Sequence, residues 1–214
     1  MSPRVGQQAR TESSCRVVPA AVRVLAFVCF AGTQHVALAA DLSRGDDRLG
    51  LAAPPLQLEH WVNSPPLEMS TLRGKVVLIR WWTEGCPFCV VTAPALREFD
   101  RKYASRGLRV IGIFHPKPPG DWSVDRMRAA GARLGLTFPL ALDADWTALN
   151  RWWPDLEKRG WTSVSFLVDK RGIIRYVHPG GEYHDSDASD SDHARCDRDY
   201  KQIDQLIERL LHEN

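Results

Sequence analysis

Two cysteines three positions apart, Cys86 and Cys89, are the residues whose type and spacing most directly indicate chemistry. They follow an apolar run and begin a predicted helix, with Pro87 and Phe88 between them. Free amide hydrogens and the positive end of the helix dipole stabilise a thiolate at Cys86, which lowers its pKa below that of a free cysteine. This thiolate attacks the disulfide of a partner, and Cys89 then displaces the partner from the mixed disulfide. The spacing therefore predicts thiol–disulfide exchange, at a potential that Pro87 and Phe88 tune.

Two other interpretations of this pair stay open. In the first, the protein is a non-catalytic binding module and the two cysteines form a structural disulfide. Half of a zinc site is disfavoured, because zinc normally needs four ligands and this chain has one such pair. A peroxiredoxin-like hydroperoxide reductase is the second alternative, because Thr83 precedes Cys86 by three positions, as in that motif. The proline expected four residues before the threonine is Ile79 here. A resolving cysteine three residues away favours exchange.

The cysteines lie at a junction between a predicted strand and a predicted helix. Residues 76–82 are apolar apart from Arg80, which is typical of a strand buried on both faces. Apolar residues then recur at helical intervals over 89–103, with Pro94 inside the helix. Strands and helices continue to alternate along the chain, and we expect an α/β fold. Its further elements are strands at 108–114 and 138–142, a helix at 123–134, a hairpin of 163–168 with 173–177, and a terminal helix around 200–210.

These elements carry a family resemblance. The run from Leu72 to Leu78 that leads to the cysteines, and the later Phe166 to Asp169 followed by Gly172, resemble the TlpA/ResA-type branch of extracytoplasmic thioredoxin-like proteins from about Trp61 to Leu211. The resemblance implies a thioredoxin-like fold, with a mixed four-to-five-stranded sheet flanked by helices. It also implies that Cys86 is the nucleophile and Cys89 the resolving thiol. No cofactor is expected beyond the redox-active disulfide of this pair.

One departure from the family pattern lies beside the predicted hairpin. Thioredoxin-like proteins have a cis-proline next to the cysteines, and Ser163 occupies that position here. A cis bond before a residue other than proline costs about 3 to 4 kcal/mol, so we expect a trans or strained peptide at Thr162-Ser163. The Ser163 hydroxyl is a candidate hydrogen-bond donor to a thiolate.

Two further departures concern charge near the cysteines. Arg80 occupies the position of a buried acid in thioredoxins; a guanidinium accepts no proton, but its charge lowers the pKa of a nearby thiol. Thr92 stands where the ResA-like branch has a glutamate, which leaves Glu84 or water as the group that deprotonates Cys89. Trp82 is a candidate to flank the disulfide, and the loop at His115 is expected on the same sheet edge as the cysteines.

A histidine- and cysteine-containing segment follows the predicted hairpin. His184, His193 and Cys196 are the candidate metal ligands, and Cys196 is alternatively a third redox thiol. The simpler interpretation is that the acidic, serine-rich stretch between the histidines is solvated and that the terminal helix buries Cys196. We therefore expect no metal.

The N-terminal residues predict export. Four arginines and one glutamate precede or flank an apolar run at 24–32, and small residues at Ala37 and Ala39 suit a signal peptidase. We expect a signal peptide at 1–39, a loose lead-in at 40–60 and one thioredoxin-like domain at 61–214. The alternative is a membrane anchor, for which the run is short. Export predicts an extracytoplasmic, periplasmic protein whose partners are exported thiol or disulfide proteins and an upstream thiol donor. The net charge of +2, without a basic cluster, excludes a nucleic-acid partner.

Overall fold

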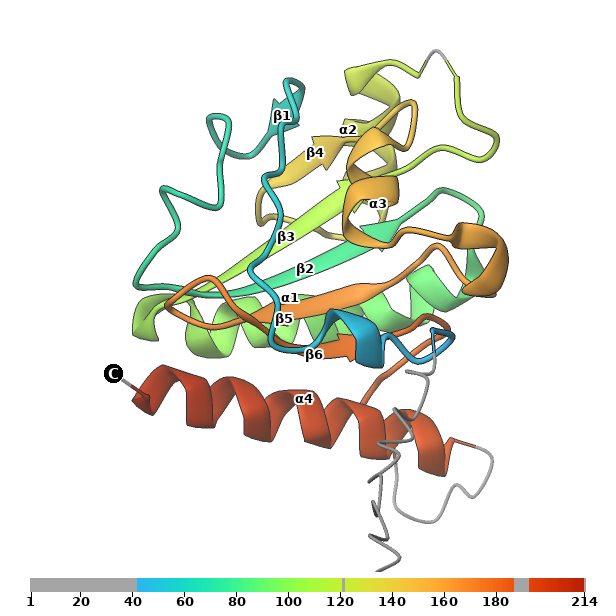
Figure 1. The fold of residues 1–214 in the computed structure, drawn as a ribbon. Helices are drawn as coiled ribbons and strands as arrows, with labels where there is room; N and C mark the ends of the chain where they lie inside the picture. The colour runs from blue at the N-terminus through green and yellow to red at the C-terminus, as the bar shows by residue number, and fades with distance from the viewer. Residues whose placement is uncertain (1–41, 121, 187–192, 214) are drawn as a thin grey trace, which may run out of the picture. The chain divides into compact units, whose positions relative to one another are not determined.

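A six-stranded mixed sheet is the central layer of the computed structural model, which describes residues 42–120, 122–186 and 193–213 (Figure 1). The strand order is β1-β4-β3-β2-β5-β6, in which β2, β3 and β4 are parallel and the other pairings antiparallel. The predicted signal peptide at 1–39 lies outside the described residues. The strands are β1 (Trp61–Val62), β2 (Val76–Trp82), β3 (Leu108–Phe114), β4 (Leu140–Leu142), β5 (Ser165–Val168) and β6 (Ile174–His178).

Helices cover both faces of this sheet, as the α/β prediction requires (Figure 1). The long helices α1 and α4, together with α2, pack on one face, and the short helix α3 packs on the other. Within the described part of the chain, no helix combines the length and the apolar character needed to span a bilayer. The helices are α1 (Pro87–Tyr103), α2 (Val124–Arg133), α3 (Thr147–Trp152) and α4 (Ala194–His212), with 3-10 turns η1 (Asp46–Arg48), η2 (Ala104–Arg106) and η3 (Leu156–Lys158).

The central strand β2 is buried at all seven positions, as its apolar sequence predicts. Successive side chains point to opposite faces, so Leu78 and Trp82 pack towards α1 while Ile79 and Trp81 pack towards α3. This alternation places Arg80 on the face covered by α1. The strand therefore carries a charged side chain into the interior close to the start of that helix.

The predicted lead-in over 40–60 is wrong in one respect, because its described part is ordered and packed. Ala52 pairs with Ile173 in an antiparallel bridge, and Leu56 is fully buried against the α3 face. The guanidinium of Arg159 donates to both carboxylate oxygens of Asp47 at 2.7 Å. Sequence periodicity does not reveal this packing, since the segment has only the three-residue turn η1 as a regular element and joins the sheet edge through long-range bonds.

The sheet also exceeds the predicted four to five strands by one. β1 has two residues, too few for an alternating pattern, and it forms only by pairing with β4. The six-residue helix α3 likewise was not predicted, and α4 begins six residues before the predicted terminal helix. The remaining strands and helices agree with the predictions to within two residues at most boundaries.

Candidate active site

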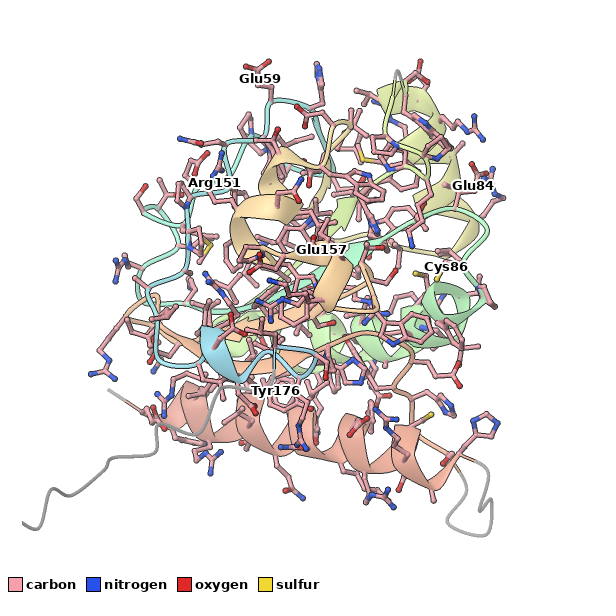
Figure 2. The ribbon with its side chains drawn as sticks, turned by 45° about the vertical axis from the view of Figure 1, so that its right-hand side comes forward. Glu59, Glu84, Cys86, Arg151, Glu157 and Tyr176 are labelled. Carbon is pink, nitrogen blue, oxygen red and sulfur yellow. The ribbon has the colours of Figure 1, made fainter. Side chains whose placement is uncertain are left out.

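Cys86 caps the N-terminal end of α1, in the turn that follows β2 (Figure 2), and Cys89 lies in the first turn of this helix. Cys86 is the N-cap residue with an extended backbone, and its Sγ accepts a hydrogen bond of 3.3 Å from the amide of Cys89. Pro87 takes the first helical position, where its missing N–H costs nothing. Cys86 is partly exposed, whereas Cys89 is only 4% exposed. Both are free thiols, so an accessible sulfur lies beside a buried one.

The two thiols behave as one titrating unit. Hydrogen bonding between the sulfurs is the largest cause of their shifts: it lowers the pKa of Cys89 and raises that of Cys86, because the Cys86 thiol keeps the shared proton. The pair therefore shares one proton, and attack by Cys86 takes place when that proton lies on Cys89.

Ser163 lies against both sulfurs, as the sequence predicted for its position. Its Oγ is 3.4 Å from Cys89 Sγ and 3.9 Å from Cys86 Sγ. The bond to this hydroxyl lowers the pKa of each thiol. The Thr162-Ser163 peptide is trans, since the cis peptide within the described residues joins Lys117 to Pro118. A hydroxyl thus occupies the place next to the sulfurs without a strained cis bond.

Arg80 is completely buried on the same side of the sheet. Its two terminal nitrogens donate to the Ser165 hydroxyl at 3.2 Å and to the Gly181 carbonyl at 2.7 Å, and its guanidinium lies 5.5 Å from the centre of the Tyr183 ring. No carboxylate in the described ranges pairs with it, and its Nε has no hydrogen-bond partner there. Its positive charge lowers the pKa of Cys89, as predicted from the sequence. A thiolate at Cys89 supplies the negative charge that this buried cation otherwise lacks.

His115 is a positioning residue whose role the sequence did not reveal. It is fully buried, with Nδ1 2.9 Å from the Trp82 carbonyl and Nε2 2.8 Å from the Thr162 hydroxyl. Burial first, and then the charge of Lys117, lower the pKa of His115 to about 3, so the ring is neutral at physiological pH. A carbonyl only accepts, so Nδ1–H donates to Trp82 and Nε2 accepts from Thr162. The ring thereby fixes the residue before Ser163 to the end of β2.

The two positions considered for a base carry no free carboxylate. Thr92 is fully buried, and its hydroxyl accepts a 3.4 Å hydrogen bond from the amide of Tyr183, so it holds the segment after β6 against α1. Glu84 forms ion pairs with Arg126, at 3.0 Å, and with Arg133, both on α2 (Figure 2). These contacts indicate that Glu84 ties the loop before Cys86 to α2.

The remaining predicted residues surround the cysteines. Trp82 is buried in the same apolar cluster as Cys89, and the Thr83 backbone lowers the pKa of Cys89 through a hydrogen bond. Phe88 packs edge to face on Trp161, with ring centres 5.2 Å apart. Trp161 is 46% exposed, so this pair presents apolar surface next to Cys86.

Comparisons with known proteins place this fold and site in a family. Residues 49–194 match the sequence profile of the Redoxin family. The chain belongs to the redoxin family. This redoxin is similar to the protein DipZ of Mycobacterium bovis, with 34% identity over 140 residues that cover 61% of this chain and 19% of DipZ. It therefore spans about a fifth of the length of the curated relatives it matches first.

Shorter relatives and solved structures agree with this membership. The thiol-disulfide oxidoreductase ResA of Geobacillus kaustophilus is 28% identical over 112 residues, which cover 52% of this redoxin and 59% of ResA. The solution structure of a putative protein disulfide isomerase from Bacteroides thetaiotaomicron superposes with a TM-score of 0.61 at 21% identity, over 78% of this chain and 91% of that one. The predicted thioredoxin-like fold and the predicted likeness to TlpA/ResA-type thiol-disulfide oxidoreductases are confirmed.

Proposed function

We propose that this redoxin catalyses thiol–disulfide exchange with exported proteins through the cysteine pair at the start of α1. One observation carries the proposal: a partly exposed Cys86 Sγ at a helix N-cap lies in a hydrogen-bonded unit with a buried Cys89, beside the Ser163 hydroxyl and the Arg80 charge. A structural disulfide has no need of an accessible sulfur or of groups that favour its thiolate. The cofactor is the redox-active disulfide of the pair itself.

The reaction follows from the access of each sulfur. The shared proton moves to Cys89, and the Cys86 thiolate attacks one sulfur of the substrate disulfide, forming a mixed disulfide and releasing a substrate thiolate. Cys89 then loses its proton to that thiolate or to water and attacks the Cys86 sulfur. The Cys86–Cys89 disulfide forms, the substrate leaves with its second thiol, and two electrons have passed to it. An upstream thiol donor reduces the pair again, and the same steps run in reverse when the substrate is the reductant.

Stabilisation of the Cys89 anion replaces the missing carboxylate base in this scheme. Arg80 and the Ser163 hydroxyl both lower the pKa of Cys89, so its proton leaves without a general base. The exposed Trp161 ring and the half-buried Phe88 ring that packs on it offer apolar contact to an unfolded or flexible substrate segment.

Reduction of insulin disulfides by the reduced protein, with dithiothreitol as donor, tests this function. We expect Cys86→Ser to abolish activity, and Cys89→Ser to accumulate a mixed disulfide with the substrate. His212→Ala, at the exposed far end of α4, is the control and should retain activity. Full function after Cys86→Ser would instead identify a binding module. Hydroperoxide consumption by the wild-type protein that decreases in Thr83→Val would identify a peroxidase.

The compartment is part of the same proposal. The predicted signal peptide at 1–39 would deliver the domain outside the cytoplasm, where disulfides persist and exported proteins are the available partners. Fractionation followed by N-terminal sequencing tests this step. A mature N-terminus at residue 40 in the periplasmic fraction is expected. An intact leader in the membrane fraction would support the anchored alternative, and intact protein in the cytoplasm would contradict export.

A further inference from the structure

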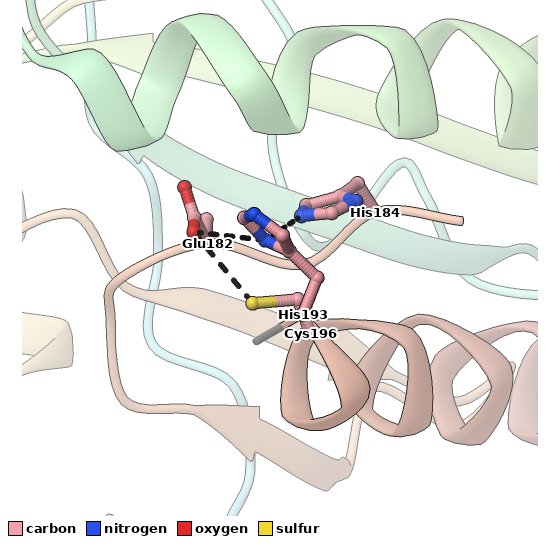
Figure 3. A group of neighbouring side chains, drawn as sticks. All are labelled: Glu182, His184, His193 and Cys196. Carbon is pink, nitrogen blue, oxygen red and sulfur yellow. Dashed lines mark hydrogen bonds and ion pairs between the residues drawn. The ribbon is translucent and has the colours of Figure 1, made fainter. Parts of the chain in front are cut away.

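Four side chains with metal-ligating atoms converge where the segment after β6 meets the start of α4 (Figure 3). Glu182 and His184 come from that segment, His193 precedes α4, and Cys196 lies in its first turn. Each residue offers one donor atom, and the four atoms all lie within 4.8 Å of one another. Cys196 is partly exposed, so the expectation that the terminal helix buries it is wrong. The sequence suggested three of these residues, while Glu182 is joined to them only by the fold.

The separations of the donor atoms suit a tetrahedral ion. The measured values are 3.1 Å from His184 Nε2 to His193 Nδ1, 3.6 Å from Cys196 Sγ to Glu182 Oε1, and 3.8 Å from His193 Nδ1 to Glu182 Oε1. Bonds to zinc of about 2.0 to 2.3 Å place neighbouring ligand atoms about 3.3 to 3.8 Å apart in a tetrahedron. The other three separations are at most 4.8 Å, so side-chain shifts of up to about 1 Å suffice to bind the ion.

A hydrogen bond outside the cluster prepares His184 as a ligand. Its Nδ1 is 3.1 Å from the carbonyl oxygen of Asp185, which can only accept, so Nδ1 carries the proton. Nε2 then bears the lone pair, and it lies 3.1 Å from His193 Nδ1 (Figure 3). Metal-bound histidines are commonly oriented by such a bond from the other ring nitrogen to a carbonyl. His193 Nδ1 is freed for the metal when its proton is carried on Nε2.

We propose that Glu182, His184, His193 and Cys196 bind one divalent transition-metal ion, with zinc the best match. A thiolate, a carboxylate and two neutral imidazoles balance the charge of Zn²⁺, and nitrogen and sulfur donors suit this borderline-soft ion. All four residues are partly exposed, and Glu182 and Cys196 line a pocket of about 200 Å³ through which the ion can enter. Binding releases the thiol proton of Cys196.

The proposed site is separate from the exchange reaction and uses neither Cys86 nor Cys89. Its consequence is structural, since the ion joins the segment after β6 to the N-terminal end of α4. Glu182 follows Gly181, whose carbonyl accepts the hydrogen bond from Arg80. The ion thereby fastens the chain that holds Arg80 in place beneath α1.

Metal binding by the full chain carrying Cys86→Ser and Cys89→Ser tests the site, because this background removes the exchange thiols. We expect one equivalent of Zn²⁺ per chain by titration against a competing chelator. Co²⁺ should give the intense visible bands of a tetrahedral ion and a sulfur-to-cobalt charge-transfer band. Cys196→Ser should abolish the charge-transfer band, and His184→Ala should weaken Zn²⁺ binding at least about 100-fold, since even outer partners of such ligands contribute 10- to 100-fold. His212→Ala, at the exposed far end of α4, is the matched control and should leave binding unchanged.

Circular dichroism of each variant separates loss of a ligand from loss of the fold. A folded Cys196→Ser protein with unaltered Co²⁺ spectra would overturn the proposal, as would binding by Cys15 or Cys29, which remain in every variant. Octahedral cobalt spectra without a charge-transfer band, or no binding at all, would show that the four side chains satisfy one another by hydrogen bonds alone. None of these outcomes depends on whether the protein catalyses thiol–disulfide exchange.

Discussion

Replacing Arg80 by methionine is the sharpest test of how this site lowers the pKa of a buried thiol. The guanidinium is fully buried, has no carboxylate partner among the described residues, and favours the anion at Cys89. An opposite charge at close range lowers a pKa by about 1 to 3 units. We therefore expect Arg80→Met to raise the first pKa of the cysteine pair by about that amount, which moves the midpoint of thiol alkylation to higher pH by about 1 to 3 units.

Arg80→Lys is the matched variant, because it keeps the charge and loses the two-armed hydrogen bonding to Ser165 and Gly181. We expect it to shift the pKa by less than about one unit. Arg80→Met removes the donor to the Gly181 carbonyl, at a cost in stability of about 1 to 3 kcal/mol, whereas the Ser165 hydroxyl keeps the Tyr183 hydroxyl at 3.1 Å as a partner. Denaturant unfolding of both variants therefore accompanies the titration.

The assay is the pH dependence of iodoacetamide alkylation and of thiolate absorbance at equilibrium. Measurements in a Cys196→Ser background remove the third thiol of the described chain. An unchanged midpoint in folded Arg80→Met would refute the electrostatic reasoning. Equal shifts in Arg80→Met and Arg80→Lys would assign the effect to the hydrogen bonds and not to the charge.

Three other variants test the neighbouring residues. Ser163→Ala removes a hydroxyl 3.4 Å from Cys89 Sγ, so the first thiol pKa should rise by up to about one unit, in line with about 0.5 to 1.5 kcal/mol for one hydrogen bond; an unaltered alkylation profile would contradict the contact. His115→Gln keeps a side chain able to hydrogen-bond but does not titrate. Burial depresses the pKa of His115 in the folded protein to about 3, so between that pH and about 6.5 the unfolded chain binds a proton that the folded protein does not. The stability of the wild type should therefore fall with decreasing pH by up to about 1.4 kcal/mol per pH unit more than that of the variant. Parallel curves of stability against pH for the two proteins would refute a buried neutral ring. Glu84→Gln should lower the free energy of unfolding by less than about 1 kcal/mol and leave insulin reduction within about twofold of wild type. A tenfold loss of turnover with the fold intact would instead identify Glu84 as the base.

The elements that position the cysteines can be predicted from local sequence. A continuous apolar strand, a turn and a helix with proline at its first position follow one another without interruption, so the junction between β2 and α1 is a local property of residues 76–103. The same holds for the hairpin of β5 and β6 around its turn. Periodicity and turn residues report such local structure because neighbouring residues alone decide it.

The groups that contact those sulfurs become apparent only in the folded chain. Ser163 lies 77 positions from Cys86 and His115 lies 47 positions from Thr162, and no pattern in the sequence encodes these contacts. The ordered lead-in and the two-residue strand β1 likewise depend on partners far along the chain. Sequence separation hides such pairs, because they form only when the sheet brings distant loops to one edge.

The location of charge and of the candidate metal ligands shows the same division. The type of residue at Arg80 was visible from the sequence, but its burial, its bonds to Ser165 and Gly181 and its effect on Cys89 came from the packing of β2 beneath α1. Glu182 joins His193 and Cys196 because the segment after β6 passes the start of α4. Sequence determines which donors and charges exist, whereas the folded chain sets their separations, and the chemistry of a site depends on those separations.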